Sequence, residues 1–517
     1  MTITIDPGRQ IGRINPNLHG QFIEFLGECL DGGVWVGPDS PIENEEGYRK
    51  GTLDALRALE PPLIRWPGGC YADTYHWRDG IGPQEQRKTT FNENFATYEL
   101  DDHSFGTDEF LRLCEKLGAE PWINVNMLSG SVAEMREWME YCNREQPTDL
   151  MQERAANGHP ASYNVKYWGL GNEVWSGGGT MTPQTYMDEY RKYASAMPKF
   201  TTSVFDPSPM YAIASGPDGN KPRERVKWTQ EFFRLLAEYR QPPIHGYDLH
   251  FYNWNVDNDA DTPTEFDEDG WNTVIKGCLE LEDILRDQWQ LINDGLALIN
   301  EPESWMDSKL SHVDLIVGEW GNWHKTAFFA RPALKQQVTM RDAVTTALTL
   351  DLLQRNCDKV TMACNAQTVN VLNSLILTEG DQTILTPNYD VFMMYKPHRG
   401  ATALDVARTD SADDSVYAFA SKSADGDELL VNLTNAHMND EAEVSLWIPG
   451  AGVTVRKSTA LAADDPHRCN TADNPEAVRA VDVPVESMTD TRATESGTEI
   501  KVRLTPASVN TLNITLA

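Results

Sequence analysis

The 517-residue sequence lacks several features that would assign its class at once. It has no apolar run near the ~20 residues that a membrane-spanning helix needs. Its first residues, MTITIDPGRQIG, show no basic segment followed by an apolar one, so we expect no secretory signal and a cytoplasmic protein. PGGC (67–70) lacks the GxGxxG spacing of a dinucleotide-binding loop. These absences disfavour a membrane protein and an open dinucleotide-binding fold.

Paired cysteines and positive charge are also scarce. The eight cysteines are scattered with no CxxC pair, which favours reduced thiols over a disulfide framework or a zinc site. Lys and Arg total 44 against 78 Asp and Glu, and the formal net charge of −34 disfavours nucleic acid and anionic membranes as partners. Only 17 residues are lysine, and the acidity is spread along the chain. This composition predicts adaptation to high salt, which screens the repulsion between surface carboxylates.

Short β-rich runs alternate with longer amphipathic, helix-like segments over most of the chain. Eight strands separated by helices predict a parallel sheet closed into a (β/α)8 TIM barrel, which we assign to residues 18–384. The predicted strands are residues 18–24, 62–68, 121–126, 166–173, 211–216, 247–252, 313–320 and 359–367.

After about residue 385 the apolar pattern changes to period two. Runs such as DELLVNLTNA (427–436) and TEIKVRLTP (498–506) predict an all-β sandwich of jelly-roll type. TITID (2–6) also alternates, so we expect the N-terminal strand to join this second domain, formed by residues 1–17 and 385–517. The stretch 462–497 is rich in Asp, Ala, Pro and Thr and is predicted to be a long surface loop.

Polar residues gather where the predicted barrel strands end. In a TIM barrel the reactive groups lie at these ends, because the following loops converge over the barrel mouth. So many polar side chains at one end are hard to explain as packing. They are Glu24, Arg65, Asn124, Asn126, Asn172, Glu173, His250, Tyr252, Glu319, Asn365 and Gln367.

Two of these residues, Glu173 and Glu319, suit the cleavage of a glycosidic bond. Glu173 ends the apolar strand in KYWGLGNEVW (166–175), where a carboxylate is costly unless it is used. One protonated carboxyl group can donate to the leaving oxygen while the other attacks the anomeric carbon, and retaining enzymes hold the two about 5–5.5 Å apart. Asn172 could bind a sugar hydroxyl beside the anomeric carbon.

Each of these residues also has a structural interpretation. A strand-end Glu is often a helix cap or an ion-pair partner. Arg65 could simply pair with Glu24, and His250 could be a core histidine. Trp320 and Trp323 could form a sugar-stacking wall or a packed barrel rim.

Six segments together resemble glycoside hydrolase family 51, which consists mainly of α-L-arabinofuranosidases. The resemblance covers nearly the whole chain, and the combination of RWPGG with GNE is its most specific part. The segments are GQFIEFLGECLDGGVW (20–35), IRWPGGCYADTYHWRDGIGP (64–83), FGTDEFLRLCEKLGAEPWINVN (105–126), WGLGNEVW (168–175), LHFY (249–252) and GEW (318–320).

This resemblance implies a retaining double displacement, with Glu173 as the acid/base and Glu319 as the nucleophile. It implies no metal or organic cofactor and a trimeric or hexameric homo-oligomer. The substrates expected are arabino- and arabinoxylo-oligosaccharides that have entered the cell and lose terminal α-L-arabinofuranose. Substrate-binding roles are implied or expected for Glu24, Arg65, Cys70, Asn172, His250, Tyr252, Gln367 and Trp323.

Two departures from the family pattern leave the sugar open. Cys70 stands where many arabinofuranosidases have Asn, and a thiol forms weaker hydrogen bonds than an amide. The segment GEWGNWH (318–324) lacks the acidic residue that commonly precedes the nucleophile. A β-xylosidase or endo-β-glucanase with the same mechanism is therefore an alternative, and a non-catalytic carbohydrate-binding barrel is a further one.

Overall fold

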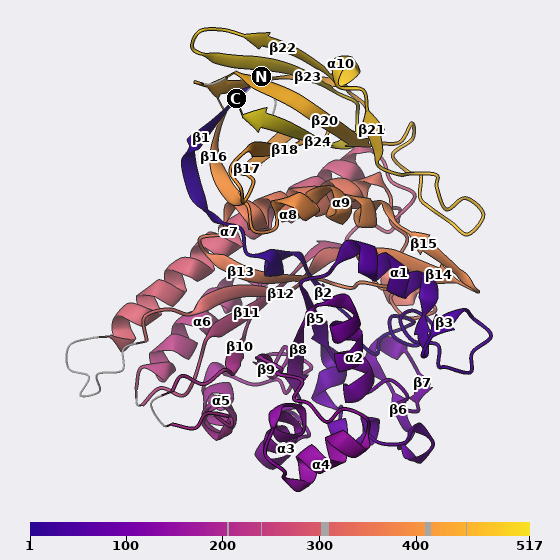
Figure 1. Ribbon diagram of the computed structural model, residues 1–517, viewed down its shortest axis with the longest axis vertical. Coiled ribbons are helices and arrows are strands. Elements are labelled where there is room, and N and C mark those ends of the chain that lie inside the picture. The colour runs from indigo at the N-terminus through magenta and orange to yellow at the C-terminus, as the bar shows by residue number, and fades with distance from the viewer. Residues whose placement is uncertain (204–205, 239, 301–309, 409–414, 451, 517) are drawn as a thin grey trace.

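The computed structural model describes residues 1–203, 206–238, 240–300, 310–408, 415–450 and 452–516. It shows a barrel surrounded by helices and, beside it, a domain built from β-sheet that carries both chain termini (Figure 1). None of the described helices is long and apolar enough to cross a membrane.

Eight parallel strands close the barrel in the order β10-β11-β12-β13-β2-β5-β8-β9. The circle closes where β13 pairs with β2 through Cys364–Gly20 and Asn365–Gln21. Each strand overlaps one of the eight predicted runs, so the predicted barrel is confirmed. The strands are β2 (Gly20–Phe22), β5 (Leu63–Trp66), β8 (Glu120–Val125), β9 (Tyr167–Leu170), β10 (Tyr211–Asp218), β11 (Gly246–Asn255), β12 (Asp314–His324) and β13 (Val360–Asn365).

Helices surround this barrel, and sequence signals mark several of their ends. The side chain of Thr182 caps α5 by accepting from the Thr185 N–H, and Pro183 occupies the first turn. Gly118 ends α2 in the left-handed conformation. The helices are α1 (Lys50–Leu59), α2 (Thr107–Leu117), α3 (Val132–Asn143), α4 (Asp149–Ala156), α5 (Pro183–Ala196), α6 (Pro222–Leu236), α7 (Glu268–Ile299), α8 (Met340–Arg355) and α9 (Pro387–Tyr395).

Three two-stranded hairpins decorate the loops around the barrel strands. Short 3-10 turns complete these loops, of which the one at Cys70–Asp73 follows β5 directly. The hairpin strands are β3 (Asn44–Glu45) with β4 (Tyr48–Arg49), β6 (Thr90–Asn92) with β7 (Glu99–Asp101), and β14 (Ile376–Glu379) with β15 (Gln382–Leu385).

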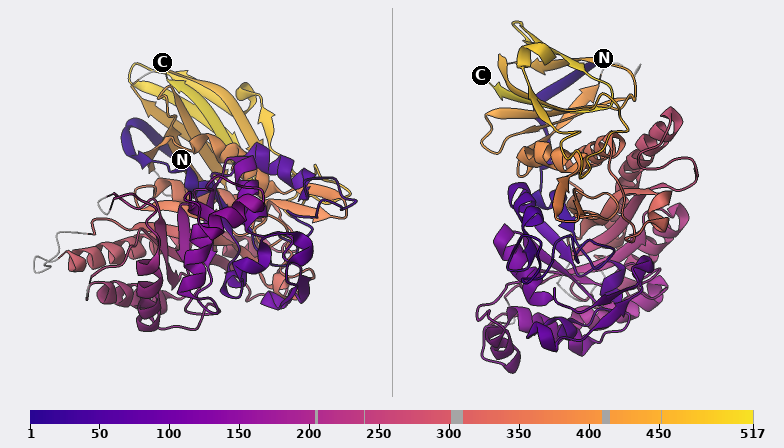
Figure 2. Two further views of the ribbon diagram at one scale, coloured as in Figure 1. Left: turned by 60° about the horizontal axis from the view of Figure 1, so that its bottom comes forward. Right: turned by 90° about the vertical axis from the view of Figure 1, so that its right-hand side faces the viewer.

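The second domain is a ten-stranded sheet that encloses its own core of aliphatic side chains and Met488. β1 (Thr2–Arg13) pairs antiparallel with β16 and parallel with β19, so the predicted entry of the N-terminal strand into this domain is confirmed. Helices α8 and α9 lie between this sheet and the barrel (Figures 1 and 2). The other elements are β16 (Thr402–Arg408), β17 (Val416–Lys422), β18 (Glu428–Asn435), β19 (Ala442–Pro449), β20 (Val453–Leu461), β21 (Val481–Val483), α10 (Val485–Met488), β22 (Thr489–Ala493), β23 (Gly497–Leu504) and β24 (Ser508–Leu516).

The prediction of one long loop over residues 462–497 was wrong in its second half. This stretch contains β21, α10 and β22. β22 is an edge strand whose residues after Thr489 are exposed, so it needs no alternating apolar pattern. The division of the chain at residues 17 and 385 stays a prediction.

Candidate active site

A cavity of about 260 Å³ opens at the C-terminal ends of the barrel strands. Most of the residues predicted for the site line it. Arg65 and Asn172 are instead buried in contact with these residues, and Arg65 donates to the Asn172 Oδ1 at 2.7 Å. The predicted residues that line the cavity are Glu24, Cys70, Glu173, His250, Tyr252, Glu319, Trp323 and Gln367.

Glu319, on β12, is held by two hydrogen bonds of 2.6 Å. Arg65 donates to its Oε1, and the Tyr252 hydroxyl donates to its Oε2. Burial raises the pKa of Glu319, but the positive charges of His250 and Arg65 and the bond from Tyr252 outweigh burial, so the pKa lies below its ordinary value. Glu319 is therefore a carboxylate at neutral pH.

Glu173 has the opposite electrostatic environment. It follows β9 with a left-handed backbone (φ 38°), a strained conformation for a residue with a side chain. Burial and the neighbouring charge of Glu319 raise its pKa, and the hydrogen bond to His250 offsets this only in part. The pKa values of two carboxyl groups in one cavity are thus shifted in opposite directions, which is the arrangement of an acid paired with a base.

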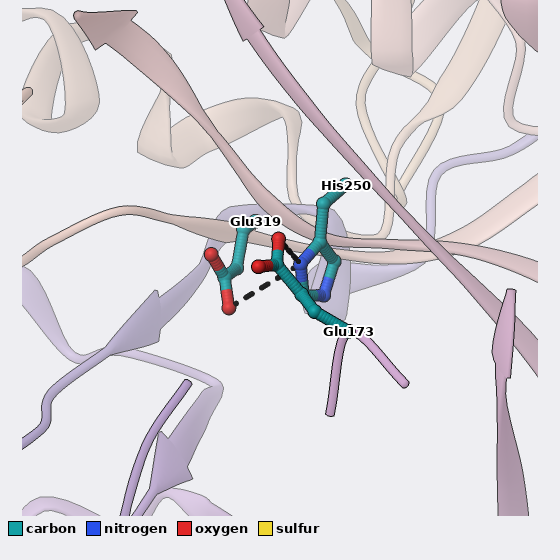
Figure 3. A group of neighbouring side chains, drawn as sticks. All are labelled: Glu173, His250 and Glu319. Atoms are coloured by element: carbon teal, nitrogen blue, oxygen red, sulfur yellow. Dashed lines mark hydrogen bonds and ion pairs between the residues drawn. The ribbon is translucent and has the colours of Figure 1, made fainter. Parts of the chain in front are cut away.

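One side-chain oxygen of Glu173 and one of Glu319 lie within 4.8 Å of each other (Figure 3). This short separation is close to the about 5–5.5 Å of retaining glycosidases and well below the about 6.5–9.5 Å of inverting ones. An inverting enzyme needs the longer gap to place a water between sugar and base. The geometry therefore favours direct attack by a carboxylate.

His250 lies between the two carboxyl groups. Its Nδ1 is 2.9 Å from Glu173 Oε1 and 3.4 Å from Glu319 Oε1. These three side chains form a cluster that could hold a metal ion. Burial lowers the pKa of His250, but Glu319 and Asp248 outweigh burial and raise the pKa to about 10. A metal could bind the ring only by displacing one of its protons. The imidazolium itself supplies the positive charge here.

The glycines of the RWPGG motif make room for Glu24. A Cβ on Gly69 would lie 2.7 Å from Glu24 Oε2, and one on Gly68 would lie 2.9 Å from it. The amide of Gln367 donates to the other oxygen of Glu24. Burial and the charge of Glu319 raise the pKa of Glu24 to about 8. Glu24 can thus present both a donor and an acceptor to a sugar hydroxyl.

Cys70 lines the cavity beside these carboxyl groups. Burial, together with the charges of Glu173 and Glu24, holds the pKa of its thiol well above the usual range. The thiol therefore stays protonated and can offer a sugar only weak hydrogen bonds.

Three predicted strand-end amides have structural roles. The Asn124 amide donates to Gly68 O at 3.0 Å, and the Asn126 amide donates to Tyr75 O at 3.1 Å. Asn365 donates to Gln367 O at 3.2 Å and so fixes the loop that carries Gln367.

Several cavity residues were missed because strands run past their predicted ends. β10 extends to Asp218 and β11 to Asn255, which places Asp218 and Trp254 on the cavity wall. A longer strand prediction would have found both residues. Trp175, Ser176 and Asn220 lie close after strand ends, whereas Phe95, Leu334 and Leu372 come from loops without a periodic signal; Leu26 and Gly69 complete the lining.

Two stacked aromatic rings, Trp254 and Trp323, line the cavity, and Phe328 packs against them. Trp254 stacks on Trp323 at 4.9 Å between ring centroids, and Phe328 stacks on Trp323 at 5.0 Å. Trp254 and Phe328 are both partly open to solvent. Trp320 is buried and stacks on Phe392, so it belongs to the packed core.

Comparison with known proteins identifies the family of this chain. Two family models match it: the α-L-arabinofuranosidase 1 domain over residues 55–270 and the α-L-arabinofuranosidase C-terminal domain over residues 318–508. An intracellular exo-α-L-arabinofuranosidase of Bacteroides ovatus is 36% identical over 86% of this chain and 83% of its own length. The solved family 51 arabinofuranosidase of Xanthomonas axonopodis pv. citri is 31% identical, covers 99% of both chains and superimposes with a TM-score of 0.87. The chain belongs to glycoside hydrolase family 51.

A further relative of known structure is the α-L-arabinofuranosidase of Thermotoga maritima, solved as an arabinose complex. It is 29% identical to the present chain, covers 100% of both chains and has a TM-score of 0.82. The barrel and the sheet domain are therefore shared over the full length, and the protein is a glycoside hydrolase.

Proposed function

We propose that this family 51 enzyme is a retaining exo-α-L-arabinofuranosidase that removes terminal α-L-arabinofuranose from arabino- and arabinoxylo-oligosaccharides. The observation that carries the mechanism is the pair of oxygens from Glu173 and Glu319 within 4.8 Å, on carboxyl groups with opposite pKa shifts. No metal or organic cofactor takes part in this mechanism.

In the first step, a carboxylate oxygen of Glu319 attacks the anomeric carbon while Glu173 donates its proton to the leaving oxygen. The products are a glycosyl ester on Glu319 and the free remainder of the oligosaccharide. In the second step, Glu173 takes a proton from water, which attacks the anomeric carbon and releases arabinose and the Glu319 carboxylate. Two displacements at the same carbon return the original configuration.

The surrounding groups hold the nucleophile and the sugar. Arg65 and Tyr252 fix both oxygens of Glu319, which makes their hydrogen bonds part of the active geometry. Glu24, Gln367 and Cys70 bind hydroxyl groups of the furanose, and Asn172 binds the hydroxyl beside the anomeric carbon. His250 orients Glu173.

Cavity size and the aromatic lining support an exo-acting enzyme on oligosaccharides. The volume of about 260 Å³ is below the ~300–1,000 Å³ of pockets for drug-sized ligands, so it suits one terminal sugar. Trp323 and Trp254 line the cavity with flat rings on which the apolar faces of the leaving saccharide can stack.

Cellular context and assembly are parts of the same proposal. The Bacteroides ovatus relative is described as intracellular, which supports a cytoplasmic enzyme acting on imported oligosaccharides. We also propose a homo-oligomer, a trimer or hexamer, which analytical ultracentrifugation would test. A monomer at micromolar concentration would contradict it.

The experiment that tests the activity compares 4-nitrophenyl α-L-arabinofuranoside, β-D-xyloside and β-D-glucoside under identical conditions. We expect the arabinofuranoside to have the highest kcat/KM and the first product, followed by ¹H NMR, to keep the α configuration. A higher kcat/KM for the xyloside or glucoside would contradict the proposed sugar specificity but not the proposed mechanism. Hydrolysis of none of the three would contradict the proposal.

A further inference from the structure

Asp248 is a buried carboxylate on β11 that the mechanism above does not use. It lies two residues before His250, so both side chains point to the same side of the strand. Its two oxygens have separate partners, one on β12 and one on His250. A buried carboxylate is costly without partners, and these two connect it to both halves of the catalytic pair.

The first oxygen of Asp248 binds a bulge in β12. Along the pairing of β11 with β12, Leu249 lies opposite Val317 and His250 lies opposite Glu319, which leaves Gly318 as one extra residue. The N–H of Gly318 donates to Asp248 Oδ1 at 2.6 Å. Such a bulge changes the direction of the side chain that follows it, which is Glu319.

Gly318 is required by this contact. A Cβ on this residue would lie 2.4 Å from Asp248 Oδ1 and 2.5 Å from its Oδ2. The carbonyl of Gly318 accepts from Arg65 at 3.3 Å, so side chains bind both of its backbone groups. The residue before the nucleophile is therefore fixed by one carboxylate and one guanidinium.

The second oxygen of Asp248 faces the ring of His250. Asp248 Oδ2 is 3.1 Å from Nε2, while Nδ1 faces Glu173 and Glu319. A carboxylate only accepts hydrogen bonds, so Asp248 requires a proton on Nε2, and the Glu319 carboxylate favours one on Nδ1. Further charged or titratable groups surround the ring and its partners. They are Asp218 on β10, Arg65 on β5, and Glu24, Cys70, Asp73 and Tyr252 beside the two glutamates.

We propose that Asp248 is a positioning residue for both catalytic carboxyl groups: it holds the bulge that aims Glu319 and keeps His250 a cation between Glu319 and Glu173. This proposal rests on the proposed acid/base and nucleophile roles. One buried side chain, that of Asp248, would then control both the orientation of Glu319 and the charge of His250, which contacts Glu173.

The decisive variant is Asp248→Asn. Its amide oxygen can still accept from Gly318, but its NH₂ group would face Nε2 and favour the neutral ring. A neutral His250 no longer lowers the pKa of Glu319 or of Glu173. The acid limb of kcat/KM reports Glu319 losing its proton and the alkaline limb reports Glu173 losing its own, so we expect both limbs to move to higher pH, by about one unit.

A matched control is Asp351→Asn. Asp351 is also buried, accepts from Asn432 at 2.7 Å and lies on α8, at the contact with the sheet domain. The Asp351→Asn substitution should leave both limbs of the pH profile of kcat/KM in place. If Asp248→Asn lowers kcat but leaves both limbs where they were, Asp248 only supports the structure and the proposal fails.

A measurement on the unaltered protein covers the case in which Asp248→Asn does not fold. In a sample with ¹⁵N-labelled histidine, the His250 signals are identified by their absence from a His250→Gln sample. We expect both ring nitrogens to be protonated at pH 8, below the pKa of about 10. A neutral ring at pH 8 would overturn the proposal. This readout needs no substrate, so it separates a wrong Asp248 role from a wrong sugar assignment.

Discussion

The interiors of the two domains differ in one respect. Among the described residues, every buried Asp, Glu, Arg or His side chain lies at or before His398, in the barrel or in the helices, hairpins and loops around it. The buried polar side chains of the sheet domain beyond that residue are neutral, and its own core consists of aliphatic side chains and Met488.

Some of the buried charged groups of the barrel belong to the proposed active site, whereas others, such as Asp351, have structural partners only. Burying a charge costs several kcal/mol unless partners compensate it. The barrel tolerates Arg65, His250, Asp248 and Glu319 in one cluster because each has an oppositely charged neighbour. We therefore expect substitutions in the cluster to affect rate, and substitutions in the sheet core to affect stability alone.

The largest expected effect is that of Glu319→Gln. The amide keeps the shape and can still accept from Arg65, but it cannot form the glycosyl ester. We expect kcat on 4-nitrophenyl α-L-arabinofuranoside to fall on the order of 10⁴-fold or more, as for other nucleophile losses. The melting temperature, followed by circular dichroism, should fall, because the buried Arg65 and His250 lose a compensating charge, so kcat is measured well below it. Retention of more than a few per cent of the activity would contradict the nucleophile role.

Glu173→Ala should have a smaller effect that depends on the leaving group. Loss of a general acid typically costs about 10²–10⁴-fold. Substrates whose leaving group needs no proton should still form the ester, which then accumulates because no base activates water. Added azide should attack this ester, restore turnover and give an α-glycosyl azide detectable by NMR. Equal losses with good and poor leaving groups would exclude the acid/base role.

In the sheet domain, Ile500→Ala tests the other half of the comparison. Ile500 lies on β23 and is fully buried in the aliphatic core. Removing its side chain should lower the free energy of unfolding by about 2–5 kcal/mol, measured by urea titration. At 25 °C, kcat/KM and its pH limbs should stay unchanged.

The neighbouring Lys501→Ala is the matched control for Ile500→Ala. Lys501 points outward from the same strand, so its removal should change stability by no more than about 0.5 kcal/mol. A change in the pH limbs with Ile500→Ala would show that the sheet core is coupled to the cavity, and the separation of roles would then be wrong.

The sequence could predict the parts of the molecule that follow a periodic pattern. All eight barrel strands and the positions of Glu173 and Glu319 follow from apolar runs and from the rule that barrel chemistry lies at strand ends. The fit of Gly69 against Glu24 could not be predicted, because the two residues meet only when neighbouring strands pair.

The features that the sequence did not predict depend on strand register and on strand length. Asp218 and Trp254 were missed because β10 and β11 extend past the apolar runs that marked them. The role of Gly318 depends on a one-residue bulge, which changes pairing without a local signal in the sequence. Edge strands such as β22 are exposed and have no alternation to detect.

The smallest expected effect concerns salt, and it compares surface charges with buried ones. The net charge of −34 lies mainly on exposed side chains, where repulsion is screened as the Debye length falls from ~10 Å at 0.1 M salt to ~3 Å at 1 M. We expect the melting temperature to rise by a few degrees between 0.1 M and 2 M KCl. Sucrose serves as the control for general stabilisation, because it is excluded from the surface without screening charge.

The buried cluster should respond differently, because salt screens buried pairs much less. The Arg65–Glu319 ion pair is closed to solvent, with side-chain exposures of 0% and 7%. The pH limbs of kcat/KM should therefore stay in place over the salt range that shifts the melting temperature. A melting temperature that is flat or falls with KCl would contradict salt adaptation. If the pH limbs move together with the melting temperature, salt screens the cavity charges as it screens surface charges. The cavity would then be open to ions, and burial could not be the reason that Glu173 and Glu319 keep different pKa values.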